Sequence, residues 1–135
     1  MDQWAREFGQ VFSEQNRAQF PANRDLLTTR SEKLSALIDE SLRLLNEAAE
    51  KYEEASQLMN TEQDKRAISL IAYSLKSEIE MKQLFKAQAQ LASDRSLTDA
   101  KAFNEKFLQL RGLIQQKQKE KDQQFDKGRR LLLRR

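Results

Sequence analysis

The sequence has 135 residues, of which 39% are hydrophobic and 33% charged, with three glycines, one proline, no cysteine and no histidine. A chain of this length and apolar content is expected to form one domain with a modest core. The lack of cysteine and histidine excludes disulfides, thiolate nucleophiles, the usual zinc sites and an imidazole proton relay. No apolar run reaches the length of a signal peptide or of a membrane span of roughly 18 residues, so we expect a cytoplasmic protein without membrane contact.

The net charge of +3 is distributed unevenly along the chain. Residues 1–95 carry 13 Lys and Arg against 16 Asp and Glu, a net of −3, whereas residues 96–135 carry 11 against 5, a net of +6. A basic end of this kind attracts polyanions through long-range electrostatics that salt weakens. Nucleic acid, an acidic peptide tail and an anionic lipid surface are the partner classes that fit.

The first half of the chain predicts a short helix followed by a long one. In residues 1–20, Trp4, Phe8, Val11 and Phe12 fall on one helical face, which predicts a short amphipathic helix. Pro21 then separates this segment from the next, because proline fits only the first turn of a helix. Apolar residues spaced by threes and fours predict one long helix over residues 23–60. They are Leu34, Ile38, Leu45, Ala48, Tyr52, Ala55 and Met59.

The second half predicts two more long helices and a tail. Thr61 can accept the amide three residues on, which favours a tight helical hairpin and a restart over residues 62–92. Ser96-Leu97-Thr98-Asp99 repeats the capping pattern and predicts a helix over 96–127, followed by a basic tail over 128–135. We therefore expect an all-α fold. Its three long helices should form an antiparallel bundle within a single domain, with the short helix before it and a basic helical extension after it.

The basic extension is the clearest candidate for a nucleic-acid contact. Residues 117–135 hold eight Lys and Arg against three Asp and Glu, and each cation could neutralise one phosphate and release a counterion. The alternative is that basic helix ends serve only the helix dipole and solubility. The predicted nucleic-acid-binding residues are Lys117, Lys119, Lys121, Lys127, Arg129, Arg130, Arg134 and Arg135.

No residue pattern indicates catalysis, a metal or a cofactor. Adjacent carboxylates such as Glu53 and Glu54 diverge by about 100 degrees on a helix, and no phosphate-binding loop accompanies them. Of the three phenylalanines in the basic third of the chain, Phe103 and Phe107 stand at helical spacing and are predicted core residues. Phe125 stands alone among polar neighbours and could stack on an unpaired base. Leu131, Leu132 and Leu133 could dock on the bundle, enter a partner or touch lipid, and docking on the bundle is the preferred interpretation.

Three segments resemble the primosomal replication protein N double-prime (PriC) family. Residues 26–40 are similar to its entry helix, residues 68–80 to its leucine-, alanine- and glutamate-rich central helix, and Phe103-Asn104-Glu105-Lys106-Phe107-Leu108-Gln109-Leu110-Arg111 to its later aromatic and charged motif. The resemblance covers roughly residues 20–115. The chain departs from the family in being shorter and less basic, and in having Leu27 where phenylalanine is usual.

The resemblance implies a non-enzymatic replication-restart factor. Such a factor binds single-stranded DNA and the acidic tail of single-stranded DNA-binding protein, and it helps to load the replicative helicase. An acidic tail with an apolar end needs a cation beside an apolar notch, which Phe103, Lys106, Phe107 and Arg111 could supply. Lys106 takes the place of the family's tail-binding arginine, although lysine lacks the bidentate fork of arginine.

A protein-only adaptor or chaperone that accepts a partner helix is the main alternative. Trafficking adaptors of the MIT type are also three-helix bundles. This alternative predicts binding through exposed apolar positions such as Leu42 and Leu44, with little dependence on salt. DNA binding predicts a steep dependence.

Overall fold

The structure is a computed structural model that describes residues 3–133, with side chains described as far as Leu131. Every regular element within this range is a helix, which confirms the all-α fold class. The helices are α1 (Gln3–Val11), α2 (Glu14–Ala18), α3 (Arg24–Gln57), α4 (Glu62–Ala89), the short 3₁₀ helix η1 (Gln90–Ser93) and α5 (Ala100–Leu133).

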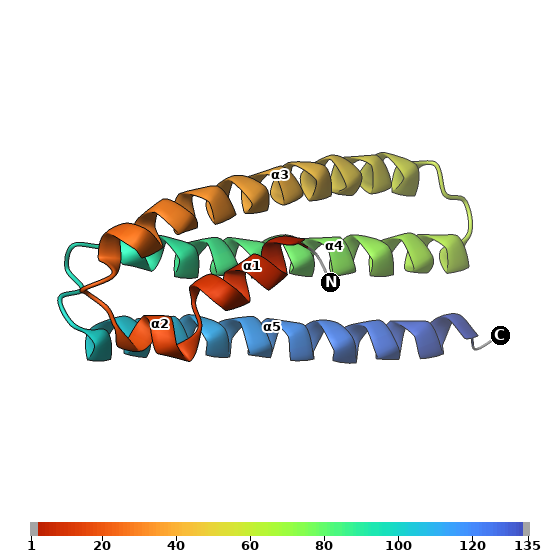
Figure 1. The fold of residues 1–135 in the computed structure, drawn as a ribbon. Coiled ribbons are helices and arrows are strands. Elements are labelled where there is room, and N and C mark those ends of the chain that lie inside the picture. The colour runs from red at the N-terminus through yellow and green to blue at the C-terminus, as the bar shows by residue number, and fades with distance from the viewer. Residues whose placement is uncertain (1–2, 134–135) are drawn as a thin grey trace.

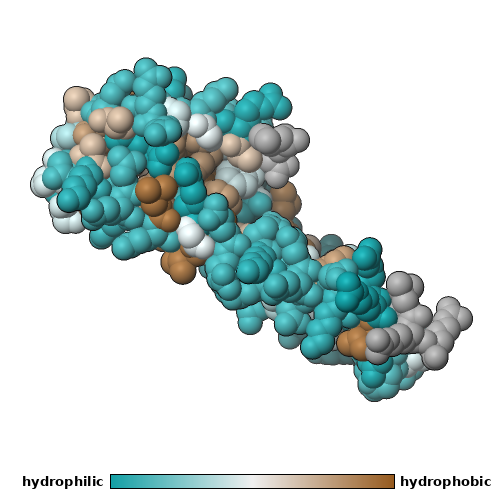
Figure 2. All heavy atoms as spheres, turned by 90° about the horizontal axis from the view of Figure 1, so that it is seen from below, coloured by the Kyte–Doolittle hydropathy of each residue, from teal (hydrophilic) through white to brown (hydrophobic). Residues whose placement is uncertain are grey.

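The three long helices lie side by side, with α4 between α3 and α5 (Figure 1). The chain reverses direction after α3 and again after η1. At one end α1 packs on α3 and α2 packs on α5 (Figure 1). We call this end the head, and we call the opposite end, formed by residues 41–76 and 117–133, the arm. Figure 2 shows a broad head and a narrower arm whose surface is largely hydrophilic.

Aromatic rings from both ends of the chain form the core of the head. Phe8 of α1 and Phe12, the residue that follows α1, pack against Phe103 and Phe107 of α5, with the centres of the Phe12 and Phe107 rings 5.6 Å apart. Phe20 stacks on Phe103 at 4.5 Å. Phe103 and Phe107 are 0% and 1% exposed. The predicted aromatic face of residues 1–20 is therefore the face that closes the core.

The arm has no such core. Within the described residues, no side chain is buried in α3 after Ile38, in α4 before Ser77 or in α5 after Ile114. The predicted stripe of residues 23–60 is thus fully buried only at Leu34 and Ile38, and it continues along the arm as half-buried residues. Fewer apolar contacts mean that polar interactions carry more of the arm's stability.

The polar stretch of residues 115–124 remains helical inside α5. Gln, Lys and Glu are good helix formers, and side chains four apart pair along the surface. Gln116 donates to Glu120 at 3.1 Å, and Gln118 donates to Asp122 at 2.8 Å. These local interactions maintain a helix that has almost no apolar face.

Two of the predicted helices differ from the structure for local reasons. Residues 1–20 do not form one helix, because Ser13 accepts the amide of Asn16 and caps a second helix, α2. The last helix begins at Ala100 and not at residue 96, because Asp99 is the residue that accepts a helical amide, from Ala102 at 2.8 Å. Ser96 instead donates to Asp94 in the preceding turn.

The predicted hairpin cap at Thr61 is confirmed, since its hydroxyl accepts the amide of Asp64 at 3.1 Å. The predicted helix over 62–92 ends its α-helical part at Ala89 and continues as η1. The predicted tail over 128–135 is wrong as a separate element, because α5 continues to Leu133. Arg134 and Arg135 lie outside the described residues.

Two glycines in α5 test how closely this helix packs on α4. A methyl group added at Gly112 meets nothing within 4 Å, whereas one added at Gly128 lies 2.7 Å from Leu70 Cδ1. We expect Gly112→Ala to raise the free energy of unfolding by about 1 kcal/mol, because alanine loses less backbone entropy than glycine. Gly128→Ala should raise the free energy of unfolding less, because the Leu70 side chain must move away from the added methyl group. Urea denaturation of both variants measures the difference, and equal gains would show that α5 does not pack on Leu70.

Candidate functional site

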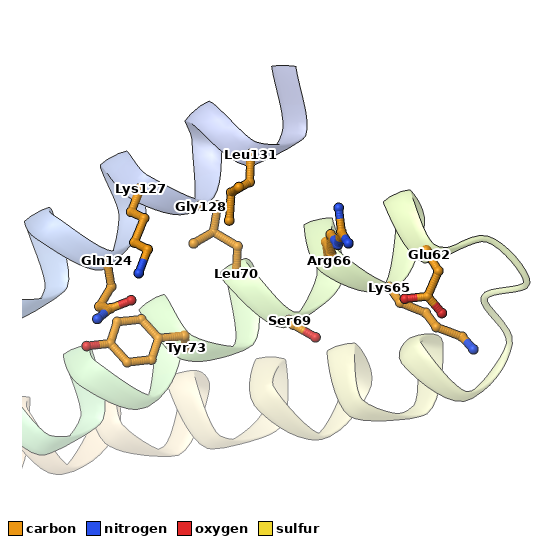
Figure 3. Close-up of a pocket in the computed structure, with 10 residues that line it drawn as sticks. All are labelled: Glu62, Lys65, Arg66, Ser69, Leu70, Tyr73, Gln124, Lys127, Gly128 and Leu131. Atoms are coloured by element: carbon orange, nitrogen blue, oxygen red, sulfur yellow. The ribbon is translucent and has the colours of Figure 1, made fainter. Parts of the chain in front are cut away.

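A groove lies between α4 and α5 in the arm, with a volume of about 530 Å³ (Figure 3). We call it the distal groove. Its lining residues come from the first three turns of α4 and from the last turns of α5. They are Glu62, Lys65, Arg66, Ser69, Leu70, Tyr73, Gln124, Lys127, Gly128 and Leu131.

The floor of the distal groove is apolar. Gly128 has no side chain, so α5 approaches Leu70 closely, and Leu131 lies one turn further along α5 (Figure 3). Tyr73 is 36% exposed and Leu131 is 44% exposed. Figure 3 places the Tyr73 ring beside Gln124. An aromatic ring and two leucines thus offer a surface for a flat apolar group.

The rim of the distal groove is cationic. Lys65, Arg66 and Lys127 are exposed, and within the described part of the chain no carboxylate oxygen lies within 4.0 Å of their charged nitrogens. Glu62 is the one acidic residue among the lining residues. Two helices therefore bring three cations and one anion around an apolar floor, and the local charge is +2.

The predicted basic face of α5 is divided by ion pairs with α4. Lys117 pairs with Glu80, and Lys121 pairs with Glu78, which also lies 3.6 Å from Lys82. The hydrogen bond to Glu80 raises the pKa of Lys117 above its usual value. Both lysines attach α5 to α4, so they do not form one open cationic face with their neighbours. That part of the prediction is wrong, because the acidic residues of α4 lie opposite them.

The remaining predicted cations are more exposed. Arg129 and Arg130 both approach Asp126, at 3.2 and 3.0 Å, with side chains 64% and 75% exposed. Lys119 is exposed, and no carboxylate of the described residues pairs with it. Lys127 is the one predicted cation that lines the distal groove. Phe125 is 42% exposed and lies with Lys121 and Arg129 at a smaller hollow.

The predicted peptide notch is not formed as an apolar surface. Phe103 and Phe107 belong to the core of the head, so neither ring is available to a partner, which corrects the prediction for these two residues. Lys106 is exposed and lies 3.9 Å from Asp94. Arg111 remains beside the predicted ring, with its Cζ atom 5.1 Å from the centre of Phe107.

Sequence reasoning missed Lys65, Arg66 and Tyr73. The Lys65-Arg66 doublet is visible in the sequence, but it lies in the acidic part of the chain and far from Lys127. Nothing in the helical periodicity indicates which turn of α4 faces which turn of α5. The register between the two helices brings these residues together.

Comparisons with known proteins identify no relative of this chain. No family model matches it, and neither a curated protein nor a solved structure matches it. Across residues 3–133, no helix is both long enough and apolar enough to cross a membrane. In the same range no group of three or more acidic side chains is arranged to hold a metal ion.

Charge reversal on α5 should distinguish a lysine that forms an ion pair with α4 from an exposed lysine that forms none, by its effect on stability. In Lys121→Glu, the ion pair with Glu78 is lost and the new carboxylate repels Glu78, so we expect the free energy of unfolding to fall by about 1–2 kcal/mol. Lys119→Glu makes the same charge change two residues away and should alter the free energy of unfolding by less than about 0.5 kcal/mol. Thermal and urea denaturation of both variants provide the measurement. Equal losses would contradict the pairing between α4 and α5.

Proposed function

We propose that this chain is a non-enzymatic binding protein that holds single-stranded DNA in the distal groove, on an antiparallel three-helix scaffold. The observation that carries the proposal is the set of three cations, Lys65, Arg66 and Lys127, that surround an apolar floor without carboxylate partners among the described residues. A surface cation that has no carboxylate partner can bind a phosphate without first breaking an ion pair within the protein.

The chemistry of the groove suits an unpaired strand better than a duplex. Proteins that bind single strands combine a positive groove that follows the backbone with aromatic rings on which bases stack. Tyr73 supplies such a ring, and all three cations are lining residues of the groove. Figure 3 shows the Lys127 and Arg66 side chains on either side of Leu70. Because bases in a duplex are already stacked on each other, they cannot reach a ring at the floor of a groove.

The cellular role and the other partners rest on the resemblance to the PriC family. We propose a cytoplasmic accessory role in replication restart, with the acidic tail of single-stranded DNA-binding protein and the replicative helicase as partners. Since Phe103 and Phe107 are buried, an acidic tail would meet the cations Lys106 and Arg111 without an apolar notch from these rings.

Fluorescence anisotropy with a labelled single-stranded oligonucleotide tests the groove. Replacing Lys65, Arg66 and Lys127 with Glu in one variant should weaken binding at least tenfold at low salt and flatten its salt dependence, because three phosphate contacts disappear. Tyr73→Ala should weaken binding about fivefold to hundredfold with the salt dependence kept, because base stacking contributes roughly 1–3 kcal/mol and no charge.

The matched control is a charge change of the same kind on α3. Lys51→Glu alters an exposed cation outside the groove and should reduce affinity by much less than the groove variant does. Circular dichroism of each variant checks that the helices remain. If the groove variant binds DNA as tightly as the unchanged protein, the proposed site is wrong.

The adaptor hypothesis has one observation in its favour. Leu44 on α3 and Leu58 directly after its last residue are 53% and 76% exposed, which leaves apolar side chains on the arm for a partner helix. Binding by this surface would change little with salt, and Leu44→Ser would weaken it while leaving DNA binding intact. A protein that ignores the oligonucleotide at low salt would favour this second function.

A further inference from the structure

Two arginines in the head lie against the same aromatic ring. Arg17 comes from α2, and its Cζ atom is 4.4 Å from the centre of the Phe107 ring. Arg111 comes from α5, and its Cζ atom is 5.1 Å from the same centre. The face of a ring attracts a cation, which explains why each guanidinium approaches Phe107. It does not explain why two like charges share one ring.

Arg17 is a nearly buried cation without a counterion. The residue is 6% exposed, and its Nε atom is buried with no hydrogen-bond partner in the part of the chain that the structure describes. Burial lowers the pKa of Arg17, and the charge of Arg111 lowers it further. Glu14 acts in the opposite direction, but its carboxylate forms no ion pair within 4.0 Å of Arg17.

An unpaired charge at a nearly buried position is costly, because it loses water and gains no ionic partner. Lys117 and Lys121 of α5, by contrast, each have a carboxylate of α4 beside them. Arg111 likewise has no carboxylate within 4.0 Å among the described residues. An anion from outside the chain would satisfy both side chains.

The charge of the two arginines favours a phosphate group over a carboxylate. The planar fork of a guanidinium donates two parallel hydrogen bonds to either group. A phosphate, however, presents oxygens in several directions and, as a monoester or free ion, carries about −1.5 to −2 charges near neutral pH. Two guanidinium groups from different helices at one ring match such an ion in charge, whereas a carboxylate offers a single charge.

We propose that Arg17 and Arg111 form a binding site for a phosphate group in the head, between α2 and α5. Arg17 is packed on Phe107, and Arg111 lies at the same ring with an exposed side chain. The site is independent of the DNA-binding proposal, because it shares no residue with the distal groove. The phosphate can be a free ion or, with one negative charge instead of two, a phosphodiester of a nucleic-acid backbone.

Inorganic phosphate is the probe for a first test on the full chain. Against chloride at equal ionic strength, phosphate should raise the midpoint of thermal unfolding by a few degrees, because a ligand that binds only the folded protein stabilises it. It should also shift the NMR signal of the Arg17 Nε–H group. The absence of both effects would overturn the proposal, and an equal effect of acetate would overturn the assignment to phosphate.

Variants assign the effect to the two arginines. Arg17→Met keeps an apolar stem on Phe107 but removes the charge, and Arg111→Gln removes the exposed partner, so each should lose the response to phosphate. Arg95→Gln removes an exposed cation elsewhere in the head and should keep it. A full response in both Arg17→Met and Arg111→Gln would contradict the site.

A short oligonucleotide identifies the source of the phosphate. If the site takes a backbone phosphate, single-stranded DNA in a phosphate-free buffer should shift the Arg17 Nε–H signal, and Arg111→Gln should abolish that shift. If it takes the free ion, only inorganic phosphate will shift the signal. The same experiment on the variant in which Lys65, Arg66 and Lys127 are replaced with Glu separates binding at Arg17 and Arg111 from binding in the distal groove.

Discussion

Packing of Phe8 and Phe12 against Phe103 and Phe107 joins the beginning of the chain to its last helix, and the rest of the structure depends on this contact. These rings bury large apolar surfaces, and each favourable ring pair adds about 0.5–1.5 kcal/mol beyond that burial. Because α1 and α2 occupy the space beside the three long helices at one end only, the molecule has a closed head and an open arm (Figure 1).

The open arm has to be stabilised differently from the head. With few apolar side chains to bury, α5 is held to α4 by ion pairs of Lys117 and Lys121 and by close packing of Leu70 at Gly128. Surface ion pairs contribute little individually, so the arm is expected to open more readily than the head. The same arrangement decides which cations remain for a partner, since a lysine that binds a glutamate of α4 is occupied.

The two candidate sites follow from opposite properties of these two parts. In the arm, Lys65, Arg66 and Lys127 remain exposed around an apolar groove because little packs over them. In the head, dense packing places Arg17 against Phe107 without a carboxylate. The cations of the distal groove are exposed to water, whereas Arg17 is nearly buried. Salt should therefore weaken the binding of an anion in the groove more than at Arg17.

The sequence by itself determined the all-α fold, the long helices, the cap at Thr61 and the aromatic face of α1, because helical periodicity and capping are local properties. It also located the excess of positive charge beyond residue 96. Helical spacing favoured Phe103 and Phe107 as core residues, whereas the resemblance also placed them at a partner's notch, and only the packing decided between the two. The sequence did not show that Lys121 forms an ion pair with Glu78, that Lys127 and Lys65 line the same groove, or that Arg17 packs on Phe107. Those relations join residues that are far apart in the chain, and only the register and packing between helices fix them.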